Sequence, residues 1–414
     1  MHVNLMPSNK IIVYDAKIYR VSRINLPDGV PCLPYLDANN VERLDCFAHA
    51  VEYDIETNQV RPLKINGGDP WCSSGGLSPD GTLVSTGGFA DGARTIRYIG
   101  GGCTDCEWRE YDQTLVEDRW YATQQILPNG EFILVGGRKS FSYEYIPQAE
   151  GQRSEKAYQF PFLYETSDID ENNLYPFVHL STDGNLFIFS NNRSLLLDPT
   201  NHKVVRTFPV LPGGSRTSAW WDAEEPNFTP ALYNPEKPKG MRFKEMKASQ
   251  IARMYHSTSV LLPSGKVWIG GSNTQDTYRD NVKYPTETRI ESFSPPYLDE
   301  AFNKYRPQIN EDASQKELTY GNLFETEFSV EDSAGLTAND IKVTMYAPPF
   351  TTHGFSMGQR LVILKIDELT EQMQGNYRVR AAAPPSGNIA PPGYYLLHVV
   401  HRGIPSTAIW VWIH

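Results

Sequence analysis

Short apolar segments recur along the first two thirds of the chain, and each is followed by a tight turn and a second apolar segment. Within each copy apolar and polar residues alternate, which is typical of a β-strand with one buried face. Four of the turns place Asp, Asn or Ser directly before Gly, a composition that permits a tight hairpin. The pattern predicts five β-hairpins, which begin near Val3, Ser73, Ala122, Phe177 and Ser257.

The spacing of these hairpins indicates a repeat. The turn glycines Gly81, Gly130 and Gly184 are 49 and 54 residues apart, and Gly-Gly pairs close three of the copies. A repeat of about 50 residues with these features is typical of kelch-type blades in a β-propeller. From Gly184 to Gly265 the distance is 81 residues, which exceeds one repeat but contains no second copy. We therefore predict a kelch-type propeller over residues 1–303; the alternative is a β-sandwich built from five unrelated hairpins.

After Pro307 the pattern changes to short alternating segments that are separated by Pro-rich turns. The expected strands are Leu323–Val330, Ile341–Tyr346, Arg360–Ile366, Tyr377–Arg380, Tyr394–His401 and Thr407–Ile413. Their number and length are typical of an immunoglobulin-like sandwich of about 100 residues, which we place at residues 304–414. Because no amphipathic helical period accompanies them, the predicted fold class is all-β, a kelch-type β-propeller followed by an immunoglobulin-like β-sandwich.

Composition and charge narrow the possible partners. The 414 residues carry a formal net charge of −11, whereas nucleic acids and anionic membranes bind basic surfaces. We therefore expect neither nucleic acid nor a membrane surface as a partner. The chain has no apolar run of the length that a transmembrane helix needs, and its first ten residues lack the apolar region of a secretion signal.

Five cysteines set limits on the redox environment. Two local disulfides, one between Cys32 and Cys46 and one between Cys103 and Cys106, would leave Cys72 alone. Free thiols are the alternative, and a zinc site at Cys103 and Cys106 lacks a second pair of ligands at the usual spacing. Disulfides form in an oxidising compartment. Because the chain begins without a secretion signal, this interpretation expects the natural N-terminus to lie upstream of the first residue.

Four short motifs hold residues that could perform chemistry: Trp71-Cys72-Ser73, Arg119-Trp120-Tyr121, Tyr255-His256-Ser257 and Thr351-Thr352-His353. Three of them stand at the start of a hairpin, and the inner strands of a propeller begin near its axis, so Cys72, Tyr121, Tyr255 and His256 could share one site. If His353 joins them, the site holds two imidazoles and two phenols. These groups offer the mixed nitrogen and oxygen ligands that suit Cu(II). The alternative for each residue is structural: a Tyr-His packing contact, a small buried cysteine, a surface histidine.

The chain resembles the galactose oxidase/glyoxal oxidase family of copper radical oxidases, and most of all plant glyoxal oxidase-like proteins. The resemblance runs over nearly the whole chain, in the order of eight motifs: WCSSGG, GGFADGAR, RWYATQQILPNG, NLYPFVHL, RMYHSTSVLLPSG, FSPPYLD, APPFTTHGFSMGQR and APPGYYLLHVVH. It implies a seven-bladed kelch propeller followed by an immunoglobulin-like domain. About two of those blades have no counterpart in this sequence.

The resemblance also implies a site. Tyr121 matches the family's copper-ligating tyrosine, which a thioether joins to a cysteine that matches Cys72. Tyr255 matches the axial tyrosine, which accepts a proton, and His256 and His353 match the two histidine ligands. The implied cofactors are copper and a protein-derived Cys-Tyr thioether radical. The implied reaction oxidises an aldehyde or a primary alcohol with O2 to the acid or the aldehyde and releases hydrogen peroxide.

Two features depart from the family pattern. Two hairpin cores are absent, and residues 213–221 join segments that are separated in relatives. Removing blades would either leave a gap with exposed strand edges or force a tighter ring that displaces the ligands. In galactose oxidase a tryptophan stacks on the cross-linked tyrosine, and the matching region here offers Phe141 or Tyr143.

Other polar residues have simpler explanations. His49 lies in a strand-like segment and is expected to be buried and hydrogen-bonded rather than a ligand. Asp91, Arg94 and Arg97 follow a Gly-Gly pair, where they would line the mouth of a substrate site or form surface ion pairs.

The leading hypothesis is therefore a copper radical oxidase, secreted to the apoplast or cell wall as in its relatives. Its partners would be a small aldehyde or alcohol and O2, with cell-wall carbohydrate as a further candidate. The rival hypotheses are a non-catalytic kelch propeller that binds carbohydrate or protein, and a truncated inactive isoform. Copper and the thioether discriminate between them, because a binding module needs neither.

Overall fold

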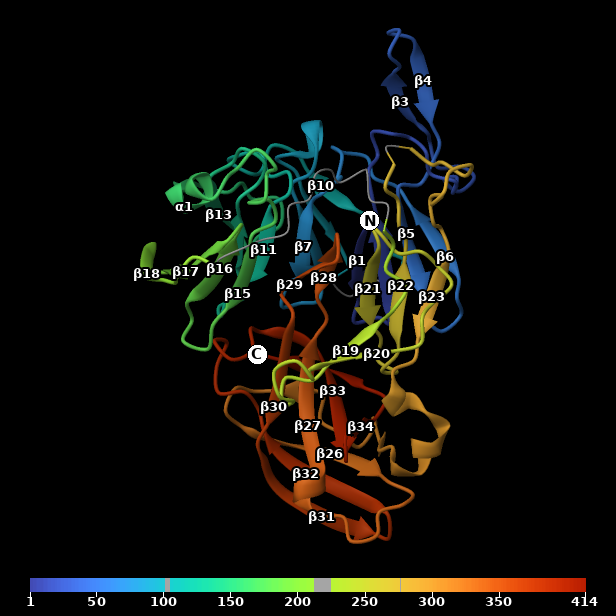
Figure 1. The fold of residues 1–414 in the computed structure, drawn as a ribbon, viewed down its shortest axis with the longest axis vertical. Coiled ribbons are helices and arrows are strands. Elements are labelled where there is room, and N and C mark those ends of the chain that lie inside the picture. Colours follow the sequence, from blue (N-terminus) through green and yellow to red (C-terminus); the bar gives the residue numbers. More distant parts are fainter. Residues whose placement is uncertain (101–104, 212–224, 276) are drawn as a thin grey trace.

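The computed structural model describes residues 1–100, 105–211, 225–275 and 277–414 (Figure 1). Strands make up almost all of its regular structure, and α1 (Pro161–Glu165) is the one α-helix in the described part of the chain. The predicted all-β class is confirmed. Within these residues no helix has the length and the apolar character that are needed to cross a bilayer.

Each of the five predicted hairpins forms the first two strands of a sheet. The first sheet contains β1 (His2–Leu5), β2 (Lys10–Tyr14), β5 (Ala50–Asp54) and β6 (Val60–Leu63). The second contains β7 (Ser74–Leu77), β8 (Leu83–Thr86), β9 (Ile96–Ile99) and β10 (Arg109–Tyr111). The third contains β11 (Thr123–Ile126), β12 (Phe132–Val135), β13 (Ser142–Ile146) and β14 (Ala157–Gln159). The fourth contains β15 (Phe177–Leu180), β16 (Leu186–Ser190), β17 (Arg193–Asp198) and β18 (Lys203–Thr207), and the fifth β21 (Thr258–Leu261), β22 (Val267–Gly270) and β23 (Ile290–Phe293).

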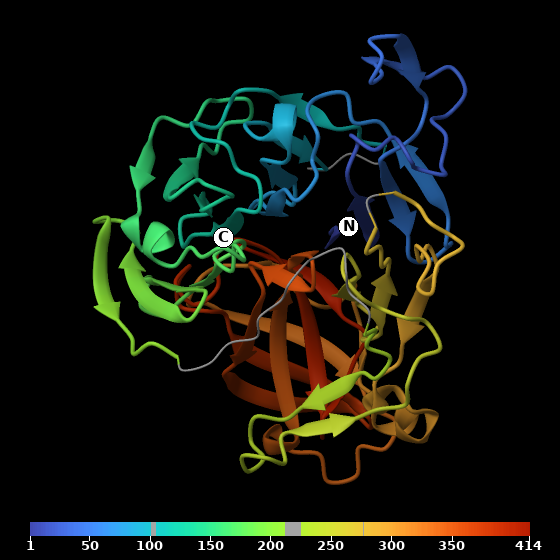
Figure 2. The same ribbon diagram turned by 45° about the horizontal axis from the view of Figure 1, so that its top comes forward.

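These five sheets stand side by side along an open arc, with β15–β18 and β21–β23 at its two ends (Figure 2). Neighbouring sheets share apolar cores; Val84 and Ile96 of the second, for example, pack with Phe132 and Leu134 of the third. Such sheet-on-sheet packing is what holds the blades of a propeller together.

The arc is open where the missing blades were expected. The junction at residues 213–221 lies outside the described residues. Between β18 and β21 the described residues form one two-stranded sheet, β19 (Ala231–Tyr233) with β20 (Phe243–Glu245), and all of its residues are exposed. The edge strand β18, which precedes this sheet in the chain, is exposed along its whole length. Among the described residues the sheets therefore leave a gap between β18 and β21 and do not close a tighter ring (Figure 2).

The remainder of the chain forms a sandwich of two sheets. One sheet contains β24 (Gln308–Ile309), β26 (Leu323–Ser329), β32 (Asn376–Ala382) and β31 (Ile366–Met373). The other contains β25 (Glu317–Leu318), β35 (Ile409–Ile413), β33 (Gly393–His401), β27 (Ile341–Ala347) and β30 (Arg360–Leu364), with β34 (Ile404–Pro405) paired to β33.

One of the predicted strands in this region is wrong. The segment expected as a single strand over Arg360–Ile366 is divided at Lys365, and its two parts belong to different sheets. The residues Leu361–Leu364 before Lys365 and Ile366 after it are all apolar, and no Gly, Pro or Asn marks the crossing.

A hairpin from this second part of the chain enters the first part. β28 (Phe350–Thr352) and β29 (Phe355–Met357) rise between the blades, and β28 pairs with β1, so that His2 faces Thr352 (Figure 1). The hairpin also packs against β7 and β21. It thus delivers His353, at its turn, to the middle of the arc.

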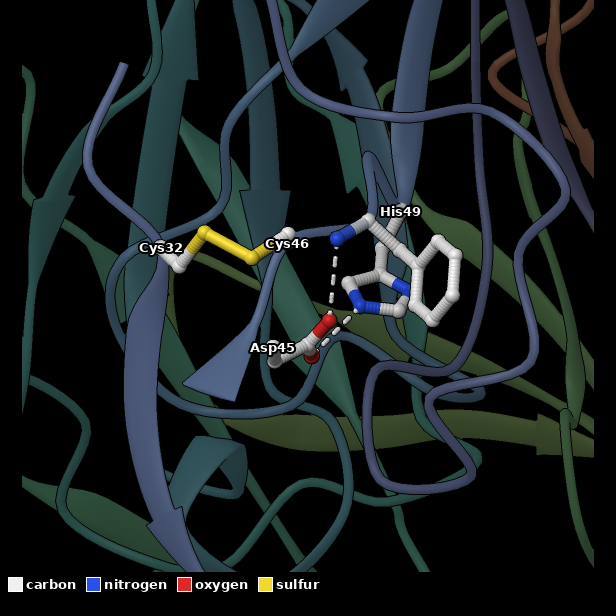
Figure 3. Close-up of a disulfide and its surroundings, with 5 residues drawn as sticks. Cys32, Asp45, Cys46 and His49 are labelled. Carbon is white, nitrogen blue, oxygen red and sulfur yellow. Dashed lines mark hydrogen bonds and ion pairs between the residues drawn. A yellow bond between two sulfur atoms is a disulfide. The ribbon is translucent and has the colours of Figure 1, made fainter. Parts of the chain in front are cut away.

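A projecting arm, β3 (Leu33–Leu36) with β4 (Glu42–Asp45), leaves the first sheet. The disulfide between Cys32 and Cys46 joins its two ends (Figure 3). Beside it the Nε2 atom of His49 lies 2.9 Å from a carboxylate oxygen of Asp45, and both side chains are buried. His49 is therefore a buried, hydrogen-bonded residue, as expected from the sequence.

Candidate metal centre

The inner strands of the arc bring the predicted site residues to one place. Cys72, Tyr121 and His256 each stand two residues before the first strand of a sheet, and each has a left-handed backbone, with φ of 55°, 65° and 65°. His353 has φ of 53° at the turn of the β28–β29 hairpin. Left-handed conformations are unfavourable for such residues and concentrate at functional sites.

The side chains of these residues lie in contact with one another. The Sγ atom of Cys72 lies 3.5 Å from Nε2 of His353. The hydroxyl oxygens of Tyr121 and Tyr255 are also 3.5 Å apart. One potential ligand atom from each of Cys72, His256 and His353 lies within 4.8 Å of the others. The structure thus assembles all five predicted residues from four separate segments of the chain.

Hydrogen bonds orient both imidazoles. Nδ1 of His256 lies 3.0 Å from the backbone carbonyl of Asn273, which can only accept, so this nitrogen carries the proton. The other nitrogen, Nε2, is buried without a partner and has a free lone pair. Nδ1 of His353 lies 2.7 Å from the hydroxyl of Thr352. A backbone or hydroxyl partner on the far nitrogen is the usual support of a metal-binding histidine.

Desolvation keeps the site uncharged in the absence of a cation. It lowers the pKa of His256 to about 3 and that of His353 well below its usual range, so both rings are neutral. It also raises the pKa values of Tyr121, Tyr255 and Cys72. A bound cation would reverse this preference at the phenols, because it favours their anionic form.

The donor set fits copper. Two neutral imidazoles and two phenols provide the nitrogen and oxygen ligands that Cu(II) prefers. The unpartnered Nε2 of His256 is a buried polar atom that a metal ion would satisfy. Cys72 is the free cysteine among the described residues, whereas Cys106 is disulfide-bonded and Cys103 lies outside the described residues.

Two arginines anchor the segments that carry the tyrosines. Arg119, fully buried, donates to Glu144 on β13 at 2.8 Å and to the carbonyl of a Gly-Gly turn at 2.8 Å. Arg253 makes the equivalent bonds to Glu291 on β23 and to the carbonyl of its own Gly-Gly turn. Both arginines lie in motifs that were singled out in the sequence, RWYATQQILPNG and RMYHSTSVLLPSG, but their glutamate partners were not predicted. The recurrence of Arg, Gly-Gly and a third-strand Glu in two blades was the available signal.

The expected aromatic neighbour of Tyr121 is wrong. Tyr143 belongs to β13, the third strand of the blade, and Phe141 directly precedes that strand; their rings pack with those of Tyr158 and Tyr164. The ring of Tyr121 instead lies 4.9 Å from that of Trp120 and 5.3 Å from that of Tyr175.

The charged residues after the second hairpin, Asp91, Arg94 and Arg97, form hydrogen bonds and ion pairs within the protein. Arg97 is fully buried and donates to two backbone carbonyls, so neither of its predicted roles is correct. Arg94 forms a surface ion pair with Asp118 at 2.6 Å. Asp91 accepts a hydrogen bond from the backbone of Asp69.

A cavity of about 430 Å³ opens beside the site, with Tyr255 and His256 in its wall. It extends between the first and the fifth sheet, past Trp71, Tyr53 and Trp268. Its volume is in the range of small-molecule sites, so a small substrate could reach Tyr255 and His256 from this side.

Comparison with known proteins agrees with this architecture. The family model of the glyoxal oxidase N-terminus matches residues 1–218 and 215–297, and that of the galactose oxidase-like early set domain matches residues 306–413. The chain is 42% identical to aldehyde oxidase GLOX1 of Arabidopsis thaliana, over all of this chain and 82% of that protein. It is 36% identical to aldehyde oxidase GLOX of Vitis pseudoreticulata, over 99% of this chain and 94% of that protein.

The fold also matches a solved structure, that of a fungal alcohol oxidase of the AA5 family in complex with copper. The TM-score is 0.67 at 16% identity, over all of this chain and 96% of that one. The alignment with GLOX1 spans 511 positions, 97 more than the 414 residues of this chain. That difference equals about two kelch repeats. The N-terminal family model divides at residues 215–218, which lie between β18 and β21 in the sequence. This chain therefore belongs to the glyoxal oxidase family, with a galactose oxidase-like early set domain and an incomplete set of propeller blades.

Proposed function

We propose that this chain is a copper radical oxidase that converts an aldehyde and O2 to the carboxylic acid and hydrogen peroxide, or a primary alcohol to the aldehyde. The observation that carries the proposal is the convergence of Cys72, Tyr121, Tyr255, His256 and His353. Relatives named aldehyde oxidases, together with a copper-containing alcohol oxidase of the same fold, support it.

Each residue has a role that follows from its geometry. Tyr121, Tyr255, His256 and His353 would hold the metal. When bound, copper would supply a one-electron redox couple and polarise the substrate oxygen. Tyr255, whose anionic form a bound cation would favour, would take the hydroxyl proton of the alcohol or of the hydrated aldehyde. Tyr121, oxidised by one electron, would take a hydrogen atom from the adjacent carbon.

Cys72 would enter through a thioether to Tyr121. In that reaction a C–S bond replaces the S–H bond of Cys72 and one ring C–H bond of Tyr121. The two protons and two electrons that are released reduce O2 to hydrogen peroxide. Cys72 and Tyr121 are adjacent for this purpose, because the backbone N–H of Tyr121 donates to the Cys72 carbonyl at 3.0 Å.

The sequence and the disulfide also bear on the domain boundary, the compartment and the partners of the enzyme. We place the boundary between the propeller and the early set domain at residues 303 and 304. The disulfide between Cys32 and Cys46 favours an oxidising compartment, which agrees with secretion to the apoplast or cell wall. The net charge of −11 disfavours nucleic acid and anionic membranes as partners. Cell-wall carbohydrate remains a candidate partner of the exposed propeller surface.

The test is to load the purified full chain with copper in air and to analyse its peptides by mass spectrometry. We expect a linked Cys72–Tyr121 peptide that is two hydrogens lighter than the sum of its parts, and peroxide release with methylglyoxal. His256→Ala should abolish copper retention. His398→Ala is the matched control, because His398 is also buried and also bonds a backbone carbonyl, at 2.9 Å from Ser406. Unlinked peptides without retained copper would instead favour a non-catalytic propeller or an inactive isoform.

A further inference from the structure

Three successive blades repeat one backbone arrangement at the centre of the arc. Cys72, Tyr121 and Tyr175 stand two residues before β7, β11 and β15, and all three have a left-handed backbone, with φ of 55°, 65° and 44°. The N–H of Tyr121 donates to the carbonyl of Cys72 at 3.0 Å, and the N–H of Tyr175 donates to the carbonyl of Tyr121 at 2.9 Å. Tyr175 thus occupies before β15 the position that Cys72 occupies before β7 and Tyr121 before β11.

The side chain of Tyr175 reaches back into the same cluster. Its ring centre lies 5.3 Å from that of Tyr121 and 5.2 Å from that of His353. Its hydroxyl donates to the carbonyl of Ser73 at 3.0 Å, one residue after Cys72. The phenol also forms a side-chain hydrogen bond with Thr352, the neighbour of His353. One buried side chain therefore touches the cysteine segment, the tyrosine ring and the histidine hairpin.

We propose that Tyr175 is a positioning residue of this site, an inference that rests on the proposed function. Its ring fixes the orientation of Tyr121 against His353, and its hydroxyl ties the segment of Cys72 to the same place. Aromatic packing alone would need only a phenylalanine. The hydrogen bond from the hydroxyl to Ser73 ties the β15 blade to the segment of Cys72 through a side chain, and it adds to the backbone bond that joins Tyr121 to Cys72.

The experiment compares Tyr175→Phe with a matched control, Tyr395→Phe, in the full chain. Tyr395 is equally buried and its hydroxyl also donates to a backbone carbonyl, that of Pro391 at 2.7 Å, but it lies in the sandwich. Two rates are measured: alkylation of the Cys72 thiol by iodoacetamide before copper is added, followed by peptide mass spectrometry, and formation of the Cys72–Tyr121 link after copper is added. Thermal unfolding shows whether both variants lose the same overall stability.

We expect Tyr175→Phe to raise the alkylation rate of Cys72 about fivefold, the weight of one ordinary hydrogen bond, and to slow link formation by a similar factor. Tyr395→Phe should change neither rate. Equal rates in the two variants would overturn the inference. If the unaltered chain forms no link and retains no copper, the proposed function fails, yet the alkylation ratio still decides the role of Tyr175.

Discussion

The hydroxyl of Thr352 offers the sharpest test of how the metal centre is built. It lies 2.7 Å from Nδ1 of His353 and is fully buried. A metal bound at Nε2 of His353 needs that nitrogen unprotonated, so the proton must be on Nδ1. The Nδ1–H group then donates a hydrogen bond to the hydroxyl oxygen of Thr352. Thr352→Val keeps the shape of the side chain but removes this acceptor, together with the hydrogen bond to Tyr175, and leaves the buried N–H of His353 without a partner. An unsatisfied buried donor costs about 1–3 kcal/mol, so we expect copper affinity to fall about 10- to 100-fold, as for other supports of metal-bound histidines.

The assay is the copper dissociation constant, measured by competition with a chelator of known affinity. Thr351→Val is the matched control, because Thr351 is the adjacent residue of the same strand, is also buried, and has a hydroxyl without a hydrogen-bond partner. Its loss should leave the dissociation constant within about twofold and should not destabilise the protein, since no bond is broken. Equal affinities in the two variants would refute the reasoning, because they would show that the Thr352 bond does not orient His353.

Three further predictions concern stability. Arg119→Met should lower the free energy of unfolding by about 3–5 kcal/mol, because it leaves the buried carboxylate of Glu144 without its ion-pair partner. The control is Arg378→Met at a more exposed ion pair, which should lower it by less than about 1 kcal/mol. Urea midpoints measure both changes. Desolvation lowers the pKa of His2 to about 3, so the unfolded chain binds the proton more readily than the folded one. The urea midpoint should therefore fall as the pH drops from about 6.5 towards 3. His2→Gln should flatten this dependence of the midpoint on pH, and an unchanged dependence would contradict the role of His2. Replacing Cys32 and Cys46 with serine should destabilise the arm by about 3 kcal/mol, seen as faster proteolysis there, and an unchanged rate would exclude a stabilising role.

The sequence predicted the chemistry of the site better than its surroundings. Cys72 and Tyr121 stand at hairpin starts, which a repeat pattern locates, so their convergence could be predicted. Tyr175 stands at an equivalent start, yet its left-handed backbone is invisible in a sequence where only glycine and asparagine mark that conformation. The prediction of Phe141 or Tyr143 was wrong because nearness along the chain was taken for nearness to the axis. The third strand of the blade, which contains Tyr143 and directly follows Phe141, lies away from the axis.

The open arc raises the question of whether a centre built from several blades can survive the loss of two. The loss falls between β18 and β21, at the outer ends of the arc. Cys72 and Tyr121 come from two adjacent blades away from the gap, and His353 comes from the inserted hairpin. Tyr255 and His256 stand directly before β21, at one end of the arc, where β21 packs against β1. That hairpin pairs with β1 and packs on β7 and β21, so every ligand segment is joined to the others through sheets that are present.

The absence of the two blades therefore affects the exposed apolar surface rather than the metal centre. Their absence leaves β18 exposed along its length, with Val204 and Val205 48% and 56% exposed, and it leaves one face of β15 uncovered at Phe177. Exposed strand edges and apolar faces favour association between molecules, but none of these residues touches the metal centre. Restoring about two blades should thus raise solubility and the unfolding temperature while it leaves the copper dissociation constant unchanged. A large gain in copper affinity on restoration would show that the ring must close to set the ligand spacing, and would contradict the role assigned here to the β28–β29 hairpin.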